Sequence, residues 1–600
     1  MNVCDISNRD FEKTKIRLAL LRERMAELDL DAFIVPSSDE HLGEYTPPEE
    51  ERLKWLTGFT GSAGMCIVLK NEAAIFVDGR YTIQVRQQLP ADTFEFKHAV
   101  KDPAVQWLLG KMTLNSRVGI DTRLHSLAWF REMKLELGQN KVEAIELENN
   151  PIDLCWKDKP KPCEGQIMLH KESFTGTSSQ VKRNAAAEVI RKRKADFALI
   201  TQLDSIAWIL NIRGNDVPKL PVVRSFVILD KSGGAVFFVD KKKLPKAFFD
   251  HVGEGVVCKK KEDLEVHLVS LGENGSKISA DPKTSNAWCQ LTCLKAGADL
   301  SEGSDPTVLA KAMKNPTELA GIRKCHLRDG AAVTRFLGWL DNEVKKGFYH
   351  DEKKLADELE RYRTELKHFQ GLSFDTISAA GANAALAHYN YLNGTPSKVE
   401  SNNLYLVDSG GQYLDGTTDI TRTVAIGKPK EEHRRMFTLV LKGHIALADA
   451  VFPEGTTGAN LDVLARQYLW KEGLDYDHGT GHGVGAFLSV HEGPQGISRS
   501  AHSQELIPGM IISNEPGFYK EGEYGIRCEN LVVVVENSDS MLSFETISFA
   551  PFDISLIDLS ILSEREIHWI NSYHESTKEK LAPFLTKKEL DWLKASTKTI

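Results

Sequence analysis

Four acidic residues and one histidine in the second half of the chain could together bind metal ions. They are Asp408, Asp419, His482, Glu515 and Glu529. The four acids lie in or beside apolar, strand-like runs, and we expect all five side chains on rigid, mostly buried elements. Like charges packed together would take up protons or destabilise the site unless cations compensate them. Oxygen-rich ligands with a single imidazole suit two divalent ions such as manganese, cobalt or zinc, linked by bridging carboxylates at roughly 3.5 to 4 Å.

A hairpin-like unit is predicted to hold the two aspartates side by side. An apolar strand from Leu404 ends at Asp408, a glycine-rich turn follows, and a β-branched strand begins at Asp419. Asp415 lies in an Asp-Gly turn between them, and we expect it to serve the turn instead of a metal.

The two glutamates are predicted to lie on stiff, extended segments. Pro516 restricts Glu515 to an extended backbone. The run "YGIRCENLVVVVEN" predicts a strand in which Arg527 and Glu529 share one face. A strand this apolar should be central in its sheet, where two charged groups must be paired.

The string "HGTGHGVG" places His478 and His482 four residues apart among four glycines. Two histidines at this spacing bind zinc when they lie on a helix with a glutamate between them. Each glycine disfavours such a helix by about 1 kcal/mol relative to alanine. We expect instead that the glycines permit backbone turns and let a substrate lie close to the loop.

The first half of the chain contains a weak internal repeat. Asp31 to Val35 and Asp196 to Ile200 both read as buried strands after a charged helical run, and Ala74 to Asp78 is matched by Ala235 to Asp240. The pattern predicts two similar α/β domains in tandem, although any two α/β domains share some of it. Pro316 then opens a strongly helical segment. The predicted domains are 1–155, 156–315 and 316–600, the last with a helical extension from about residue 545.

Charge and composition narrow the partners and the compartment. The net charge of −9 argues against nucleic acid as the main partner. No stretch approaches the roughly 18 apolar residues of a membrane span, and the first 30 residues lack a signal-peptide pattern. The nine cysteines are scattered and odd in number, which favours reduced thiols. We expect a cytoplasmic protein that binds neither nucleic acid nor membrane.

The ordered strings "DGTTDITRT", "HGTGHGVG", "EPGFY" and "GIRCEN" resemble those of the pita-bread metallopeptidases. The length and three-part layout resemble the aminopeptidase P branch of that family. The resemblance covers essentially the whole chain. It implies an α/β (α+β) fold with two creatinase-like N-terminal domains and a pita-bread catalytic domain.

The resemblance also implies a reaction: hydrolytic removal of the N-terminal residue from peptides with proline second. Asp408 would chelate one metal, Asp419 and Glu529 would bridge both, and His482 and Glu515 would complete the second. A hydroxide held between two divalent ions, with manganese expected ahead of zinc or cobalt, would attack the scissile carbonyl. Glu515 would relay the proton.

Further residues match family positions that bind no metal. The resemblance implies that His388 and His491 steady the tetrahedral intermediate and pass protons. It implies that His478, Tyr519 and Arg527 shape the pocket for the proline ring. Because relatives with a similar C-terminal extension form homodimers, the resemblance also implies a homodimer for this chain.

Three alternatives stay open from sequence alone. A prolidase uses the same metal set on dipeptides. A methionine aminopeptidase would leave the first 315 residues without a purpose. Pita-bread domains that only bind proteins or RNA have usually lost metal ligands, whereas all five positions are present here.

Overall fold

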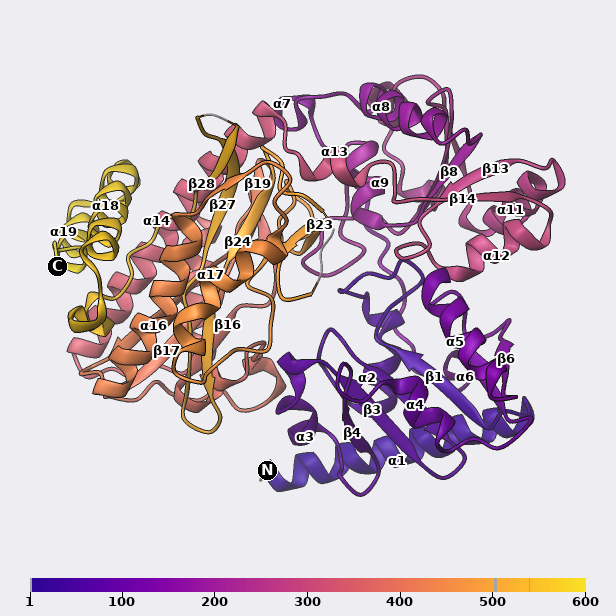
Figure 1. Ribbon diagram of the computed structural model, residues 1–600, viewed down its shortest axis with the longest axis horizontal. Coiled ribbons are helices and arrows are strands. Elements are labelled where there is room, and N and C mark those ends of the chain that lie inside the picture. Colours follow the sequence, from indigo (N-terminus) through magenta and orange to yellow (C-terminus); the bar gives the residue numbers. More distant parts are fainter. Residues whose placement is uncertain (1–2, 501–503, 539) are drawn as a thin grey trace. The chain divides into compact units, whose positions relative to one another are not determined.

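A computed structural model describes residues 3–500, 504–538 and 540–600 of the chain. It forms two compact units (Figure 1). Unit 1 consists of Met1–His170 and Thr177–Thr307, and unit 2 of Lys171–Gly176 and Val308–Ile600. The first two predicted domains therefore lie almost wholly in unit 1, and the division into three domains stays a prediction.

Unit 1 contains two six-stranded sheets with the same topology. The first is ordered β4 (Glu95–His98), β3 (Ala73–Val77), β2 (Met65–Leu69), β1 (Ala32–Pro36), β5 (Arg117–Ile120) and β6 (Glu143–Glu146). The second is ordered β12 (Val256–Lys259), β11 (Ala235–Phe238), β10 (Phe226–Asp230), β8 (Phe197–Ile200), β13 (Lys277–Ala280) and β14 (Asp299–Glu302). In each sheet a central strand pairs antiparallel with one neighbour and parallel with the other. The predicted tandem α/β domains are confirmed.

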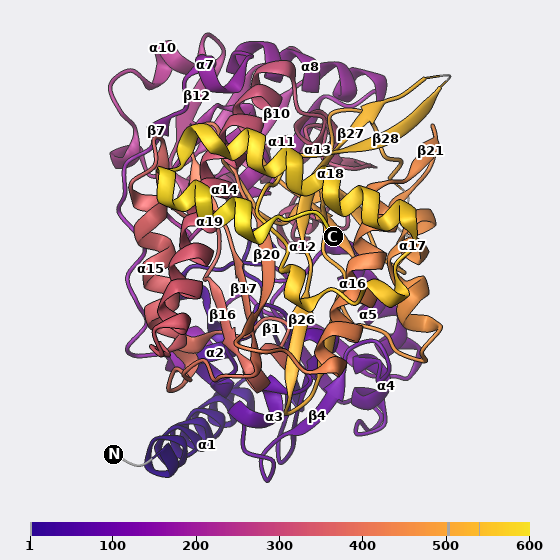
Figure 2. The ribbon, with the colours of Figure 1, turned by 90° about the vertical axis from the view of Figure 1, so that its left-hand side faces the viewer.

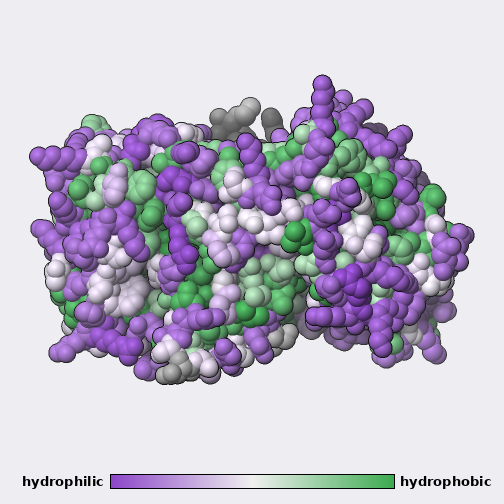
Figure 3. Space-filling model, turned by 90° about the horizontal axis from the view of Figure 1, so that it is seen from above, coloured by the Kyte–Doolittle hydropathy of each residue, from purple (hydrophilic) through white to green (hydrophobic). Residues whose placement is uncertain are grey.

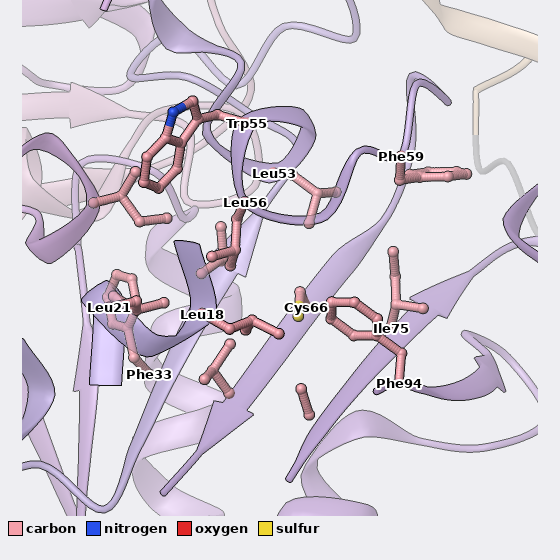
Figure 4. Packing of buried hydrophobic residues seen from close by; sticks show 14 of the residues in the cluster. Leu18, Leu21, Phe33, Leu53, Trp55, Leu56, Phe59, Cys66, Ile75 and Phe94 are labelled. Atoms are coloured by element: carbon pink, nitrogen blue, oxygen red, sulfur yellow. The ribbon is translucent and has the colours of Figure 1, made fainter. Parts of the chain in front are cut away.

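The repeated helix before each central strand packs its apolar face on the sheet. Helix α1 (Val3–Glu27) precedes β1, and α8 (Ser179–Lys192) precedes β8. Leu18, Leu21 and Met25 recur at helical spacing on α1 and are almost fully buried. Figure 4 shows Leu18 and Leu21 beside Phe33 of β1 in this core.

Unit 2 repeats another pattern, a pair of helices followed by strands. The first pair is α14 (Pro316–Lys345) and α15 (Glu352–Thr364), and the second is α16 (Glu431–Ala448) and α17 (Gly458–Trp470). Helix α14 begins as the sequence predicts, with Pro316 in its first turn. Asn315 caps the helix, because its side chain accepts hydrogen bonds from the Thr317 and Glu318 amides.

Within the described residues of unit 2, the strands form four sheets of two to six strands. Two of these sheets carry the site residues. The first is ordered β16 (Ile377–Ala380), β17 (Asn403–Ser409) and β20 (Ile420–Ile426). The second is ordered β21 (Val451–Pro453), β28 (Met541–Thr546), β27 (Asn530–Glu536), β24 (Ile511–Asn514), β22 (Gly481–Gly483) and β23 (Glu492–Ile497). A third sheet is ordered β15 (Phe369–Leu372), β18 (Gly411–Tyr413) and β19 (Gly416–Thr417). The fourth consists of β25 (Gly517–Lys520) and β26 (Tyr524–Arg527).

The C-terminal extension is helical, but it begins later than predicted. Strand β28 continues to Thr546, and the first α-helix, α18 (Glu564–Leu581), starts 18 residues further on, followed by α19 (Lys587–Ser596). Figure 2 shows α18 and α19 side by side in yellow, and both contact α14. Ile570, Tyr573 and Leu581 of α18 are buried in the core of unit 2.

Hydrophilic and hydrophobic residues are mixed over the face that Figure 3 draws. Among the helices that the structure describes, none combines the length and the apolar character that a membrane span requires.

Candidate metal centre

Two antiparallel strands bring the predicted aspartates together. Strand β17 pairs with β20, and Asp408 lies opposite Thr421, while Asp419 immediately precedes β20. The sequence predicts a glycine-rich turn between the two aspartates, but the structure has two further strands in this segment. Strands β18 and β19 form a separate hairpin that pairs with β15. Asp415 lies in that hairpin and accepts a hydrogen bond from Arg328 at 2.6 Å, and it is not one of the residues whose donor atoms cluster as a possible metal site.

His482 lies on a strand, not on a helix. Strand β22 packs so tightly that a Cβ on Gly481 would lie 1.9 Å from the Ser513 carbonyl oxygen, and one on Gly483 2.2 Å from that of Glu492. Neither glycine has a positive φ. The expectation that the glycines leave room for substrate is therefore wrong at these two positions, since neighbouring strands fill that space.

The ring of His482 is oriented by its own backbone. Its Nδ1 donates to the Gly483 carbonyl at 2.9 Å, so the neutral ring presents the Nε2 lone pair. This Nε2 lies 3.5 Å from Asp419 Oδ2 and 3.5 Å from Glu515 Oε1. A backbone acceptor on one nitrogen is the usual arrangement for a histidine whose other nitrogen binds metal.

Arg527 and Glu529 do not lie on one continuous strand, which corrects the sequence prediction. Strand β26 ends at Arg527, and β27 begins at Asn530 in a different sheet. Strand β27 is central in that sheet, as expected. Thr421 nevertheless joins the two charged groups, because its hydroxyl donates to Glu529 at 2.6 Å and accepts from Arg527 Nε at 3.2 Å.

The cluster has the donor atoms that a divalent cation requires. One donor atom each from Asp419, His482 and Glu529 lies within 4.8 Å of the others. Asp408 Oδ1 and Asp419 Oδ1 are buried, with no hydrogen-bond partner among the residues that the structure describes. Orphaned buried carboxylate oxygens are costly unless a cation satisfies them.

The raised pKa values of the clustered carboxylates also indicate that the site requires cations. Burial, with Glu529 and Asp408 nearby, raises the pKa of Asp419 well above its usual value. Burial, with Asp408 and Glu515, does the same to the pKa of Glu529. Burial raises the pKa of Glu515 to about 7, with Arg527 opposing and Asp408 adding to the shift. One arginine does not neutralise four carboxylates, so the donor set fits two divalent cations.

Arg527, Tyr519 and His478 form a hydrogen-bonded line that starts at the carboxylates. Arg527 Nη2 donates to Asp408 Oδ2 at 2.6 Å, and its Nη1 donates to the Tyr519 hydroxyl at 2.6 Å. The Tyr519 hydroxyl lies 2.9 Å from His478 Nε2. The three residues predicted to shape one pocket are thus brought together.

Of the other two predicted histidines, His491 lies beside His482, and His388 follows a residue that contacts Arg527. The ring centroid of His491 lies 4.3 Å from that of His482. His388 follows Ala387, whose carbonyl accepts from Arg527 Nη1 at 3.2 Å, so its backbone passes beside the site.

Sequence reasoning missed Thr421 and Ser513, which orient the metal positions. The Ser513 hydroxyl donates to Glu515 Oε1 at 3.2 Å and accepts from the His482 amide at 2.9 Å. Each of the missed residues lies two positions from a predicted ligand, Thr421 from Asp419 and Ser513 from Glu515. The period of two along a strand could have identified both.

Arg466 of α17 was also missed, and it holds the loop before His482. Its guanidinium donates to the carbonyls of Tyr476 and His478, both at 2.8 Å, and to Asp462 at 2.7 Å. Asp462 in turn accepts from the Thr480 hydroxyl at 2.6 Å. No local pattern connects an arginine on a helix to these carbonyls.

Comparisons with known proteins define the class. The model of metallopeptidase family M24 matches residues 320–536, and the model of its C-terminal region matches 540–600. Two models of the creatinase/prolidase N-terminal domain match residues 17–153 and 158–318. Fold and site therefore define a metallopeptidase with tandem creatinase-type domains.

Individual relatives narrow the class further. A probable Xaa-Pro aminopeptidase P from Aspergillus fumigatus is 41% identical, over 98% of this chain and 93% of its own. One from Paracoccidioides brasiliensis is 39% identical, over 98% and 99%. The crystal structure of X-prolyl aminopeptidase from Caenorhabditis elegans, described as a cytosolic enzyme with a di-nuclear active site, matches with a TM-score of 0.93 and 34% identity, over 98% of this chain and 100% of that one. The chain belongs to the aminopeptidase P branch of the M24 metallopeptidases, which confirms the predicted resemblance.

Proposed function

We propose that the chain is a metal-dependent aminopeptidase that removes the N-terminal residue from peptides with proline at the second position. The observation that carries this proposal is the cluster of His482 with the buried carboxylates of Asp419 and Glu529, in a chain with full-length similarity to Xaa-Pro aminopeptidases. Family M24 membership supports hydrolysis as the chemistry.

We propose two divalent cations, manganese in the first instance, as the cofactor. Asp408 would bind one, Asp419 and Glu529 both, and His482 with Glu515 the other. When bound, two such cations supply Lewis acidity that lowers the pKa of water toward neutrality. The orphaned oxygens of Asp408 and Asp419 and the raised carboxylate pKa values support this assignment.

The protein would contribute proton transfer and stabilisation of charge. Glu515 is proposed to take up a proton at its carboxylate and return it to the leaving amine. His491 and His388 are proposed as donors to the negative charge that develops on the scissile carbonyl oxygen. The short distance between the rings of His491 and His482 supports this role for His491.

His478, Tyr519 and Arg527 are proposed to form the pocket for the proline ring. Proline makes the scissile amide tertiary and removes its N–H, so a general peptidase that binds that N–H is disfavoured. The hydrogen-bonded line from Asp408 to His478 supports this assignment, because it would join the pocket to the metal positions. Arg466 would keep His478 in place through its carbonyl.

The testing experiment measures hydrolysis of X-Pro peptides of increasing length by protein loaded with Mn²⁺, with and without chelator. Release of the first residue from Arg-Pro-Pro-containing peptides, lost with chelator and in His482→Ala, is the expected result. Release of proline from Gly-Pro with the longer peptides left intact would instead indicate a prolidase.

We also propose that the protein is a cytoplasmic homodimer. The description of the Caenorhabditis elegans neighbour as cytosolic supports the compartment. The homodimer rests on the family resemblance, and light scattering on the purified protein tests it: a monomer at micromolar concentration would contradict it.

A further inference from the structure

Arg422 lies directly behind the metal centre. It is 1% exposed and occupies β20 next to Thr421. Successive side chains of a strand point to opposite faces. Thr421 contacts Glu529 and Arg527 on the metal side, so Arg422 points to the other side, where the chain from Ala550 to Tyr573 lies.

Arg422 binds the main chain of a proposed metal ligand. Its Nη1 donates to the carbonyls of Glu529 at 2.6 Å and Thr421 at 2.8 Å. The Thr421 carbonyl also accepts from the Glu529 amide at 3.3 Å. This is the point where β26 ends and β27 has not begun. Arg422 therefore stabilises the break in the strand that sets the direction of Glu529.

Arg422 also donates hydrogen bonds to the C-terminal extension. Nη2 donates to the Ala550 carbonyl and the Tyr573 hydroxyl, both at 2.8 Å, and Nε donates to the Pro551 carbonyl at 3.2 Å. The guanidinium carbon lies 4.2 Å from the centre of the Phe552 ring. In the described part of the chain no carboxylate forms an ion pair with Arg422. The extension is thus a main source of the dipoles that make this buried charge tolerable.

A second branch of the same network reaches the segment of Glu515. Asn530 Oδ1 accepts from Arg422 Nη2 at 2.8 Å, and its Nδ2 lies 3.3 Å from His444 Nε2. Burial and then Arg422 lower the pKa of His444 to about 3, so the ring is neutral and its Nδ1 donates to the Asn514 carbonyl at 3.0 Å. Asn530 adjoins Glu529, and Asn514 adjoins Glu515. One network therefore holds the backbone beside both glutamates.

We propose that the helical extension helps to fix the geometry of the metal centre. Tyr573 of the extension and Arg422 of β20 are positioning residues for Glu529 and Glu515. The proposal rests on the proposed function for the metal roles of those two glutamates. The extension then acts on cation affinity, in addition to burying apolar surface. Groups that orient ligands typically change metal affinity by roughly 10- to 100-fold when they are removed.

Tyr573→Phe is the sharpest test, because it removes one hydroxyl and keeps the ring in the core. We expect the affinity for Mn²⁺, measured by titration with electron paramagnetic resonance on the full-length folded protein, to fall by about tenfold. Arg422→Lys keeps the charge but not the fork of donors, so a larger loss within the same range is expected.

Tyr405→Phe is the matched control. Tyr405 is fully buried in the same unit, and its hydroxyl lies 2.7 Å from the Ser378 hydroxyl, outside the network of Arg422. It should lose stability in urea to a similar extent and keep the Mn²⁺ affinity of the wild type. Unchanged Mn²⁺ affinity in folded Tyr573→Phe, or an equal loss in Tyr405→Phe, would overturn the positioning role alone. Wild-type protein that binds no Mn²⁺ would overturn the metal site and this role with it.

Discussion

The two histidines of "HGTGHGVG" differ in what their ring nitrogens contact. His482 Nε2 lies 3.5 Å from two carboxylate oxygens, whereas His478 Nε2 lies 2.9 Å from a tyrosine hydroxyl. His482→Ala should lose one cation per chain and about 100-fold or more in activity, since it removes a ligand itself. His478→Ala should keep both cations and lose about tenfold in kcat/KM on proline substrates. Metal analysis by mass spectrometry separates the two, and equal metal contents would contradict the assignment.

Glu515 makes the stability of the metal-free protein depend on pH in a defined direction. Its folded-state pKa is raised to about 7, while an unfolded glutamate titrates near pH 4.3. Between these values the folded chain binds more protons than the unfolded chain, so the free energy of unfolding falls as pH rises. Above about pH 7 this contribution is lost. Urea unfolding in chelator at several pH values from 5 to 8 measures the slope.

Glu515→Gln supplies the comparison, because an amide cannot titrate. The variant should show a shallower fall of stability with pH, since it also removes a charge that raises the pKa of Asp419 and of Glu529. Saturating Mn²⁺ should reverse the trend in the wild type, because cations compete with protons for the carboxylates. Identical slopes in the two metal-free proteins would show that Glu515 does not titrate as proposed.

At the scale of single elements, two glycines of β22 are expected to be irreplaceable for packing reasons. A Cβ at Gly481 would lie 1.9 Å from the Ser513 carbonyl, whereas at Gly479 the nearest heavy atom would be 3.5 Å away. Gly481→Ala should therefore destabilise unit 2 by about 3 kcal/mol and displace His482. Gly479→Ala, in the same motif, should change stability by less than about 1 kcal/mol. Urea unfolding measures both, and a tolerated Gly481→Ala would refute the argument.

The elements also show what the sequence could predict. The acids were found because each stands at the end of an apolar run, where strand and turn signals are local. The break between Arg527 and Asn530 was missed because the run of valines reads as one strand, and the separate pairing partners of β26 and β27 are distant in sequence. The start of the extension was misplaced for a similar reason, because β28 pairs with β27 and β21 instead of forming a helix. Arg422, Tyr573 and Arg466 act through contacts with distant segments, which no spacing encodes.

At the scale of the whole molecule, a buried ion-pair cluster joins the two repeats of unit 1. Arg224 of the second repeat lies 2.8 Å from Glu49, 2.7 Å from Glu50 and 3.0 Å from Glu40, all in the first repeat. The side chain of Glu49 is only 4% exposed. Burial opposes ionisation of Glu40, yet Lys261, His41 and Arg224 together hold its pKa below the usual range. The cluster therefore pairs three largely buried carboxylates of the first repeat with one arginine of the second.

Replacement of Arg224 should lower the unfolding free energy more than replacement of an arginine in an exposed ion pair between the same two repeats. Arg224→Met leaves Glu49 buried and without its ion-pair partner, so a loss of about 3 kcal/mol in unfolding free energy is expected. Arg131 also pairs across the repeats, with Glu302, but both side chains are 46% exposed, and Arg131→Met should cost less than about 1 kcal/mol. Both variants keep the metal centre in unit 2 unchanged, so Mn²⁺ content serves as an internal check on folding there. Similar losses of unfolding free energy in the two variants would contradict this prediction, because they would show that burial of the carboxylates does not make the ion pairs of Arg224 more important for stability.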